Sequence, residues 1–188
     1  MNFLGHFFLS PDHPEQIVGN FMADFVKGKK FLDYPQGIAE GIMIHRSIDH
    51  FTDTHPSFLQ SKRKFFENYR HFSGVITDMV YDHLLARYWQ MFHVEPLEVF
   101  AERMYATISP FKNILPEGSL MTFTYMRKNN WLVNYAHKEG LTRSLKGLSR
   151  RIPYDINLEN AVVDLEIAYN QYFEEFKNFI VDARLKFK

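Results

Sequence analysis

Residues 41–56, GIMIHRSIDHFTDTHP, combine the spacing of an amphipathic helix with side chains that could do chemistry. At about 100° per residue, His45 and Asp49 lie one turn apart on the same face, beside an apolar stripe. Burying an imidazole and a carboxylate together is unfavourable unless both are satisfied, and a divalent cation satisfies both through their lone pairs. We therefore interpret the pair as metal ligands. The alternative is an aspartate that only hydrogen-bonds a core histidine.

A second pair of acids follows in residues 77–84, TDMVYDHL, where Asp78 and Asp82 are also one turn apart and have apolar neighbours. Two carboxylates on one partly buried face repel each other, and a cation beside them relieves that repulsion. The pattern therefore predicts two further metal ligands. The alternative is a pair of solvated surface acids.

Two more polar residues interrupt apolar runs, His6 in NFLGHFFL and Asp24 in GNFMADFVKG. Taken singly, they are explained by a satisfied core histidine and a buried helix cap. Helices that supply histidine and carboxylate ligands from facing surfaces are, however, a known way to build a metal site. The chain has no cysteine, so the ligands must be nitrogen and oxygen, a set that suits Mn, Fe, Mg or Zn and favours Mn or Fe. The predicted ligand set is His6, Asp24, His45, Asp49, Asp78 and Asp82.

The segments that must position these residues have helical length and are separated by proline and glycine signals. With 46% apolar and 23% charged residues, the composition is that of a globular protein. We expect one compact, irregular, all-α domain over residues 1–188, in which only Met121–Tyr125 could pass for a short strand. The predicted helices cover 14–27, 36–53, 56–70, 75–92, 96–109, 120–138, 141–150 and 157–185.

Several functional classes receive no support from the sequence. It contains no GxGxxG, P-loop, HExxH, GxSxG or CxxC motif. Its formal net charge is zero, which gives no overall attraction to nucleic acid. The first ten residues are apolar but lack a basic region and are shorter than a membrane span. We therefore expect a cytoplasmic protein that binds neither nucleic acid nor membranes.

Six segments together resemble one known family, in this order and at these separations: MNFLGHFFLS, GNFMADFVKG, HRSIDHFTD, DMVYDHLLARYW, NNWLVNY and SRRIP. From Met1 to about Tyr172 the chain is similar to the acyl carrier protein phosphodiesterases. The resemblance implies a hydrolase that removes the 4′-phosphopantetheine arm from holo acyl carrier protein. It also implies a manganese cofactor, with Mg²⁺ or Fe²⁺ as alternatives, and an all-helical fold distantly related to the HD-domain phosphohydrolases. No His-Asp dipeptide occurs here, so the ligand order departs from the HD pattern and the ligand set stays open.

Such a reaction needs more than a cation. The leaving serine alkoxide of the carrier protein requires a proton, which His50 or His83 could give. Arg46 could grip the phosphate oxygens with its planar guanidinium, although an ordinary surface arginine explains it nearly as well. The predicted catalytic residues are His50, His83 and Arg46.

The resemblance also implies a protein substrate that is strongly acidic around its modified serine. Residues 127–151 contain seven basic side chains and one acid, whereas residues 154–176 contain six acids and no basic residue. The two segments could neutralise each other, or the first could form a basic docking surface, which would speed encounter at low salt. The predicted partner-binding residues are Arg143, Lys146, Arg150 and Arg151. The sequence does not determine the oligomeric state.

Two other functions stay open. The first is an HD-like metal phosphohydrolase acting on a nucleotide or small phosphoester, for which we expect a base-stacking pocket. The second is a non-catalytic helical interaction module in which the acids and histidines are structural.

Overall fold

The protein, described here from a computed structural model of all 188 residues, is built from helices alone. The eleven α-helices and the short 3₁₀ turns between them confirm the all-α prediction, and Met121–Tyr125 lies within a helix. The α-helices are α1 (Phe3–Leu9), α2 (Pro14–Met22), α3 (Gln36–Thr54), α4 (Pro56–Tyr69), α5 (Ser73–Arg87), α6 (Leu97–Ile108), α7 (Glu117–Lys128), α8 (Trp131–Asn134), α9 (Lys138–Ser149), α10 (Ala161–Ile167) and α11 (Tyr169–Phe187). The 3₁₀ turns are η1 (Ala23–Phe25), η2 (Lys30–Asp33), η3 (Arg70–Phe72), η4 (Trp89–Met91), η5 (Ser109–Ile114) and η6 (Leu158–Asn160).

The structure divides two segments that the sequence predicts as single helices and adds one helix that it misses. Residues 120–138 are interrupted at Asn130, whose backbone is left-handed with φ 43°, a conformation that asparagine tolerates better than most residues. Residues 157–185 are interrupted at Ala168, between α10 and α11. The N-terminal α1 is only 7 residues long and apolar almost throughout, so it lacks an amphipathic pattern.

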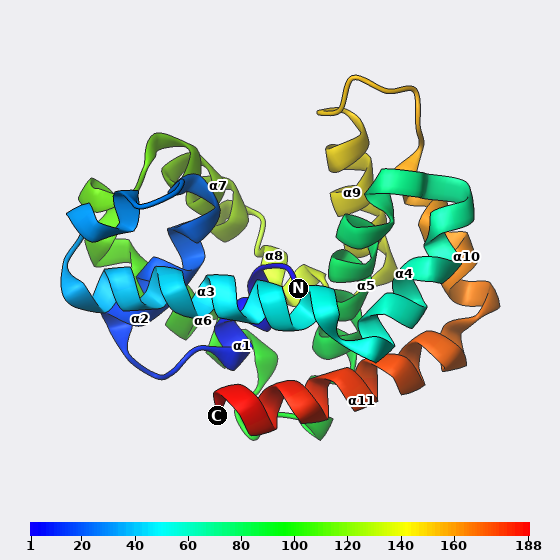
Figure 1. The fold of residues 1–188 in the computed structure, drawn as a ribbon, viewed down its shortest axis with the longest axis horizontal. Coiled ribbons are helices and arrows are strands. Elements are labelled where there is room, and N and C mark those ends of the chain that lie inside the picture. Colours follow the sequence, from blue (N-terminus) through cyan, green and yellow to red (C-terminus); the bar gives the residue numbers. More distant parts are fainter.

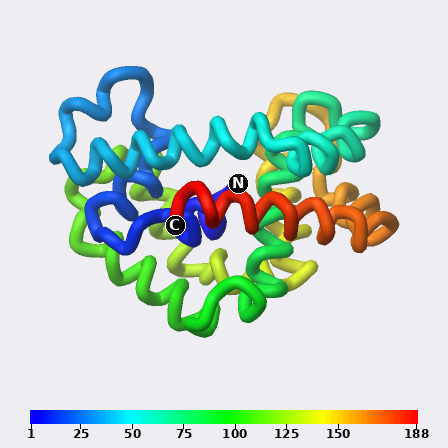
Figure 2. Tube along the Cα trace, turned by 60° about the horizontal axis from the view of Figure 1, so that its bottom comes forward, coloured from blue at the N-terminus to red at the C-terminus, as the bar shows by residue number.

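Helix α3 runs from one side of the molecule to the other and joins the two sides (Figure 1). Helices α2, α6 and α7 lie on one side, and α4, α5, α9 and α10 lie on the other, with α1 between them. Figure 2 shows α11 running along the molecule beneath α3. The aromatic rings of Phe51 on α3 and Phe179 on α11 are in contact, with centroids 5.6 Å apart. One connected cluster of 46 buried apolar residues runs through both sides.

Close packing fixes how α2 and α3 lie against each other. A Cβ atom on Gly19 would lie 2.1 Å from the carbonyl oxygen of Ile38, and one on Gly41 would lie 2.2 Å from that of Gln16. Only glycine permits this approach of the two backbones. Because α2 leads into η1 and α3 carries His45, this contact sets the distance between Asp24 and His45.

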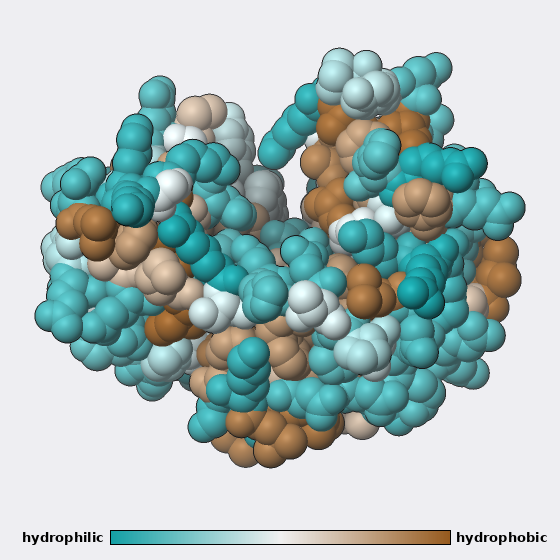
Figure 3. Space-filling view, viewed as in Figure 1, coloured by the Kyte–Doolittle hydropathy of each residue, from teal (hydrophilic) through white to brown (hydrophobic).

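A cleft of about 750 Å³ opens between the two sides and is visible as a notch in the space-filling view (Figure 3). Residues of α1, η1 and α3 line one part of it, and residues of α5, α8 and α9 line much of the rest. No helix combines the length and the apolar character that are needed to cross a bilayer.

Candidate metal centre

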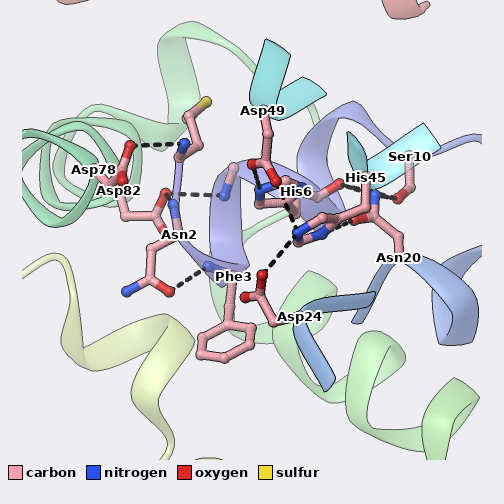
Figure 4. A network of polar contacts seen from close by, with 12 residues as sticks. Asn2, Phe3, His6, Ser10, Asn20, Asp24, His45, Asp49, Asp78 and Asp82 are labelled. Atoms are coloured by element: carbon pink, nitrogen blue, oxygen red, sulfur yellow. Dashed lines mark hydrogen bonds and ion pairs between the residues drawn. The ribbon is translucent and has the colours of Figure 1, made fainter. Parts of the chain in front are cut away.

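Two histidines and two aspartates converge on one wall of the cleft (Figure 4). Asp49 lies between the histidines, with Oδ1 3.2 Å from Nε2 of His6 and Oδ2 3.1 Å from Nε2 of His45. The carboxylate of Asp24 approaches the same nitrogen of His45 to 3.3 Å. One ligand atom from each of His6, His45 and Asp49 lies within 4.8 Å of the others. We call these four residues the His–Asp cluster.

His45 is held by a hydrogen bond on the ring nitrogen that faces away from the carboxylates, whereas Nδ1 of His6 is buried without a hydrogen-bond partner. His45 Nδ1 is 3.0 Å from Oδ1 of Asn20, whose amide nitrogen donates to the carbonyl oxygen of His6 and to Oγ of Ser10. The amide oxygen can only accept, so Nδ1 of His45 carries the proton and Nε2 faces the carboxylates. The ring of His6 stacks on that of His45, with centroids 4.0 Å apart. Asn20 therefore joins α1, α2 and α3 at the cluster.

The electrostatics of the cluster favour a cation. Burial lowers the pKa of His6 to about 4, which the hydrogen bond to Asp49 offsets only in part. Burial also lowers the pKa of His45, but the hydrogen bonds to Asp24 and Asp49 outweigh it and raise that pKa to about 9. The hydrogen bond from His45 lowers the pKa of Asp24, and the bonds from both histidines outweigh burial and lower that of Asp49. Both carboxylates are therefore ionised at neutral pH.

The ligand atoms are accessible from the cleft although the rings are buried. The side chains of His6 and His45 are 5% and 8% exposed, whereas those of Asp49 and Asp24 are 43% and 67% exposed. A cation at the cluster would therefore have protein on one side and the open cleft on the other. Catalytic metal sites need such an open position for water or substrate.

Asp78 and Asp82, both on α5, are not among the residues whose ligand atoms converge in the His–Asp cluster. Asp82 is fully buried, and its two oxygens accept hydrogen bonds from the backbone amides of Asn2, Leu4 and Gly5 at 3.2, 2.7 and 3.1 Å. It satisfies the free amides at the start of α1. Burial raises its pKa to about 7, against the opposing effect of the amino group of Met1. Asp78 lines the cleft but lies 2.9 Å from that amino group.

The three residues predicted to assist catalysis do not line the cleft. Arg46 donates to the carbonyl oxygens of Val26 and Gly28 at 3.0 and 2.9 Å, and so anchors the loop after η1. His83 is buried, with Nδ1 2.7 Å from the carbonyl oxygen of Tyr135, and burial lowers its pKa. His50 is exposed on α3, away from the cluster. The sequence placed these residues near the ligands, but their helix faces direct them elsewhere.

The predicted partner-binding residues divide into two pairs. Arg143 and Arg151 line the cleft, whereas Lys146 and Arg150 do not. All four are exposed, and none forms an ion pair. Among the seven basic residues of 127–151, Lys138 is the one that pairs with the acidic segment, through Glu166, so the two segments do not neutralise each other as a whole.

The structure adds residues that the sequence reasoning did not select. Asn20 orients His45, and Thr52, Asp53 and Trp131 line the cleft. The sequence does mark Asn20, because it is a polar residue in the apolar run VGNFM. Asp53 follows Asp49 by one turn, which places it on the same side of α3. Trp131 gave no such signal, because its position depends on the break at Asn130.

Comparison with known proteins identifies the family. The family described as "Acyl carrier protein phosphodiesterase" matches residues 1–183. A protein of that name from Photorhabdus laumondii is 32% identical over 180 residues, covering 95% of this chain and 91% of the relative. Relatives of the same name from Pectobacterium atrosepticum and Serratia proteamaculans are 32% and 31% identical, covering 92% and 95% of this chain and 90% and 93% of their own. No solved structure matches the chain significantly. The matches confirm the resemblance found in the sequence, and the chain belongs to the acyl carrier protein phosphodiesterase family.

Proposed function

We propose that this chain hydrolyses the phosphodiester that joins 4′-phosphopantetheine to a serine of holo acyl carrier protein, and so releases the apo protein. Membership of the family over residues 1–183 makes the chain a phosphodiesterase. The observation that carries the proposal is the His–Asp cluster on the wall of an open cleft of about 750 Å³. Pockets that bind small molecules and cofactors typically have volumes of about 300–1,000 Å³.

The residues of the cluster fit a divalent cation. Two imidazole nitrogens and two carboxylates form an oxygen-rich set without thiolate, which suits Mn²⁺ and also Mg²⁺ or Fe²⁺. The contact between His45 Nδ1 and Asn20 is the support that a metal-binding histidine normally has on its second nitrogen. His6, His45 and Asp49 would hold the ion, with Asp24 as the most exposed ligand.

A bound divalent cation supplies charge neutralisation at the diester and lowers the pKa of the attacking water. The chain's own residues prepare the site for it. Asn20 fixes the proton of His45 on Nδ1, so that Nε2 faces the cleft, and Asp49 holds both rings in register. No catalytic role is assigned to Arg46, His50 or His83, because they do not line the cleft.

The proposed docking surface for the carrier protein is the outer face of α9, with Lys146 and Arg150. These side chains are exposed and without ion pairs, beside the mouth of the cleft that Arg143 and Arg151 line. A positive rim would attract an acidic partner and orient it toward the cleft.

Mass spectrometry of holo acyl carrier protein incubated with the purified, Mn²⁺-loaded chain tests the proposal. We expect the mass of the carrier protein to fall by that of the phosphopantetheine arm, and we expect excess chelator to stop the reaction. Metal analysis of the same sample shows how much cation is bound. A metal-loaded protein that leaves the arm in place would contradict the proposed reaction.

A nucleotide or small phosphoester is the second candidate substrate. Phe3, Phe25 and Trp131 line the cleft and offer aromatic faces on which a base could stack. Hydrolysis of a panel of nucleotides by the same metal-loaded protein tests this candidate. Membership of a phosphodiesterase family argues against the non-catalytic interaction module.

A further inference from the structure

We propose that Arg143 and Arg151 form a phosphate-binding wall inside the cleft, which holds the scissile phosphodiester across from the His–Asp cluster. The inference rests on the proposed function and assigns these two arginines to the reacting group rather than to the surface of the carrier protein. Arg143 and Arg151 line the cleft, whereas Lys146 and Arg150, which belong to the same basic segment, do not.

Helical geometry explains why these two arginines line the cleft and the other two basic residues do not. Arg143, Gly147 and Arg151 are four residues apart, so they follow one another along a single face of α9. Arg151 lies just beyond Ser149, the last residue of the helix, and its backbone amide donates to the carbonyl oxygen of Leu148 at 2.9 Å. The chain therefore stays close to its helical path, and both arginines line the cleft.

The charges of the cleft require a positive group on this wall. Asp24, Asp49, Asp53 and Asp78 all line the cleft, and the amino group of Met1 compensates one of them. A divalent cation alone would leave these carboxylates with a net negative charge, which repels an anionic diester. Arg143 and Arg151 reverse that sign.

The two guanidinium groups are available for a ligand. Neither is engaged in an ion pair or a side-chain hydrogen bond within the protein, unlike Arg103, which bonds Glu95 and Asp12. A guanidinium presents a planar fork of donors that matches two phosphate oxygens. Two unpaired guanidinium groups in the same cleft as a cation site could hold a phosphodiester between themselves and the cation.

Gly147, between the two arginines, has no side chain that would project into the cleft. A glycine inside a helix costs about 1 kcal/mol relative to alanine, so its presence calls for a reason. At Gly140 the reason is packing, since a Cβ atom there would lie 1.9 Å from the carbonyl oxygen of Asn134. At Gly147 a Cβ atom would meet nothing within 4 Å. This open space borders the cleft and lets a ligand approach the backbone of α9.

The test compares two substrates in the Mn²⁺-loaded protein: holo acyl carrier protein and bis(4-nitrophenyl) phosphate. We expect Arg143→Gln and Arg151→Gln each to lower kcat/KM for both substrates by about 10- to 100-fold, as the loss of a charged hydrogen bond predicts. Arg143→Lys should recover part of the loss, since it restores the charge without the fork. Arg63→Gln on α4 is the matched control, an exposed arginine without ion pairs that does not line the cleft.

Binding of inorganic phosphate to the Mn²⁺-loaded protein, measured by calorimetry, provides a readout that needs no turnover, and both glutamine variants should weaken it. Variants that lower activity toward the carrier protein alone, while the small diester and phosphate binding are unaffected, would overturn the inference and assign these arginines to docking. Unchanged kinetics for both substrates would also overturn it. If the wild type acts on the small diester but not on the carrier protein, the proposed substrate fails, whereas the comparison on the small diester still decides the role of the arginines.

Discussion

At the scale of single residues, the position of Asp49 between two histidines makes it the central member of the His–Asp cluster. Asp49→Ala removes the oxygens that meet Nε2 of both His6 and His45. If the proposed function holds, we expect the variant to bind metal more weakly than the wild type and to hydrolyse holo carrier protein more slowly by on the order of 10²-fold or more. Its helical content should be unchanged, because Asp49 is partly exposed and packs into no core.

Metal analysis and circular dichroism of Asp49→Ala measure both expectations. The matched control is Asp53→Ala, which removes an exposed carboxylate one turn further along the same side of α3 and should retain the metal. An Asp49→Ala protein that binds metal as the wild type does would remove Asp49 from the ligand set.

A substitution of Asp82 should affect the stability of the fold rather than metal binding. Its carboxylate accepts three backbone amides at the start of α1 and is fully buried. Asp82→Ala leaves the two buried donors, the amides of Leu4 and Gly5, without a partner, and each buried unsatisfied group costs about 1–3 kcal/mol. We expect the free energy of unfolding to fall by about 2–6 kcal/mol, measured by urea titration, and Asp82→Asn to lose less because it keeps one acceptor oxygen. A fully stable Asp82→Ala protein would contradict the capping role.

The contrast between these two aspartates shows what the sequence could and could not predict. Asp49 follows His45 by four residues, and Asp82 follows Asp78 by four, so the local patterns look alike. The structure separates them because the start of α1 packs against α5 and presents free amides to Asp82. That partner comes from a segment 78 residues away, which periodicity along α5 does not reveal.

At the scale of elements, the contact between α2 and α3 determines the geometry of the cluster. Gly19→Ala would place a Cβ atom 2.1 Å from the carbonyl oxygen of Ile38, a backbone group that cannot turn aside. The helices must then separate, which moves Asn20 away from His45. We expect a loss of about 1–3 kcal/mol in unfolding free energy, as for other overpacked sites, together with weaker metal binding.

Urea titration and metal titration of the Gly19→Ala protein measure these two effects. Gly74→Ala on α5 is the matched control, because its Cβ atom would meet only the flexible end of Lys62, at 3.7 Å. That protein should be as stable as the wild type or more so. Equal metal affinity in the Gly19→Ala protein would show that the cluster does not depend on the spacing of α2 and α3.

The helices themselves were largely predictable, and the exceptions have local causes. Turn signals at Pro14, Pro35 and Pro56 gave the beginnings of α2, α3 and α4 closely. The break at Asn130 was missed because the apolar spacing continues through it, and only its left-handed backbone ends α7. That break turns α8 toward the cleft, so the wall that contains Trp131 could not be predicted from the sequence.

At the scale of the whole molecule, the formal net charge is zero, so an acidic partner must be attracted by a local surface. Lys146 and Arg150 supply one on the outer side of α9, next to the cleft, and neither is neutralised by an ion pair. Charges of this kind act mainly on encounter, and salt screens them over about 8–10 Å.

We therefore expect the double variant Lys146→Glu, Arg150→Glu to raise the KM for holo carrier protein, most strongly at low ionic strength. The difference from the wild type should shrink as salt is added, because screening removes an attraction that the variant lacks. Steady-state kinetics over a salt series measures this, with Arg63→Glu on α4 as a charge-reversed control. If the double variant and the wild type show the same KM at low salt, the carrier protein docks elsewhere. The basic residues Lys27, Lys29 and Lys30 beside Asp24 then become the next surface to test.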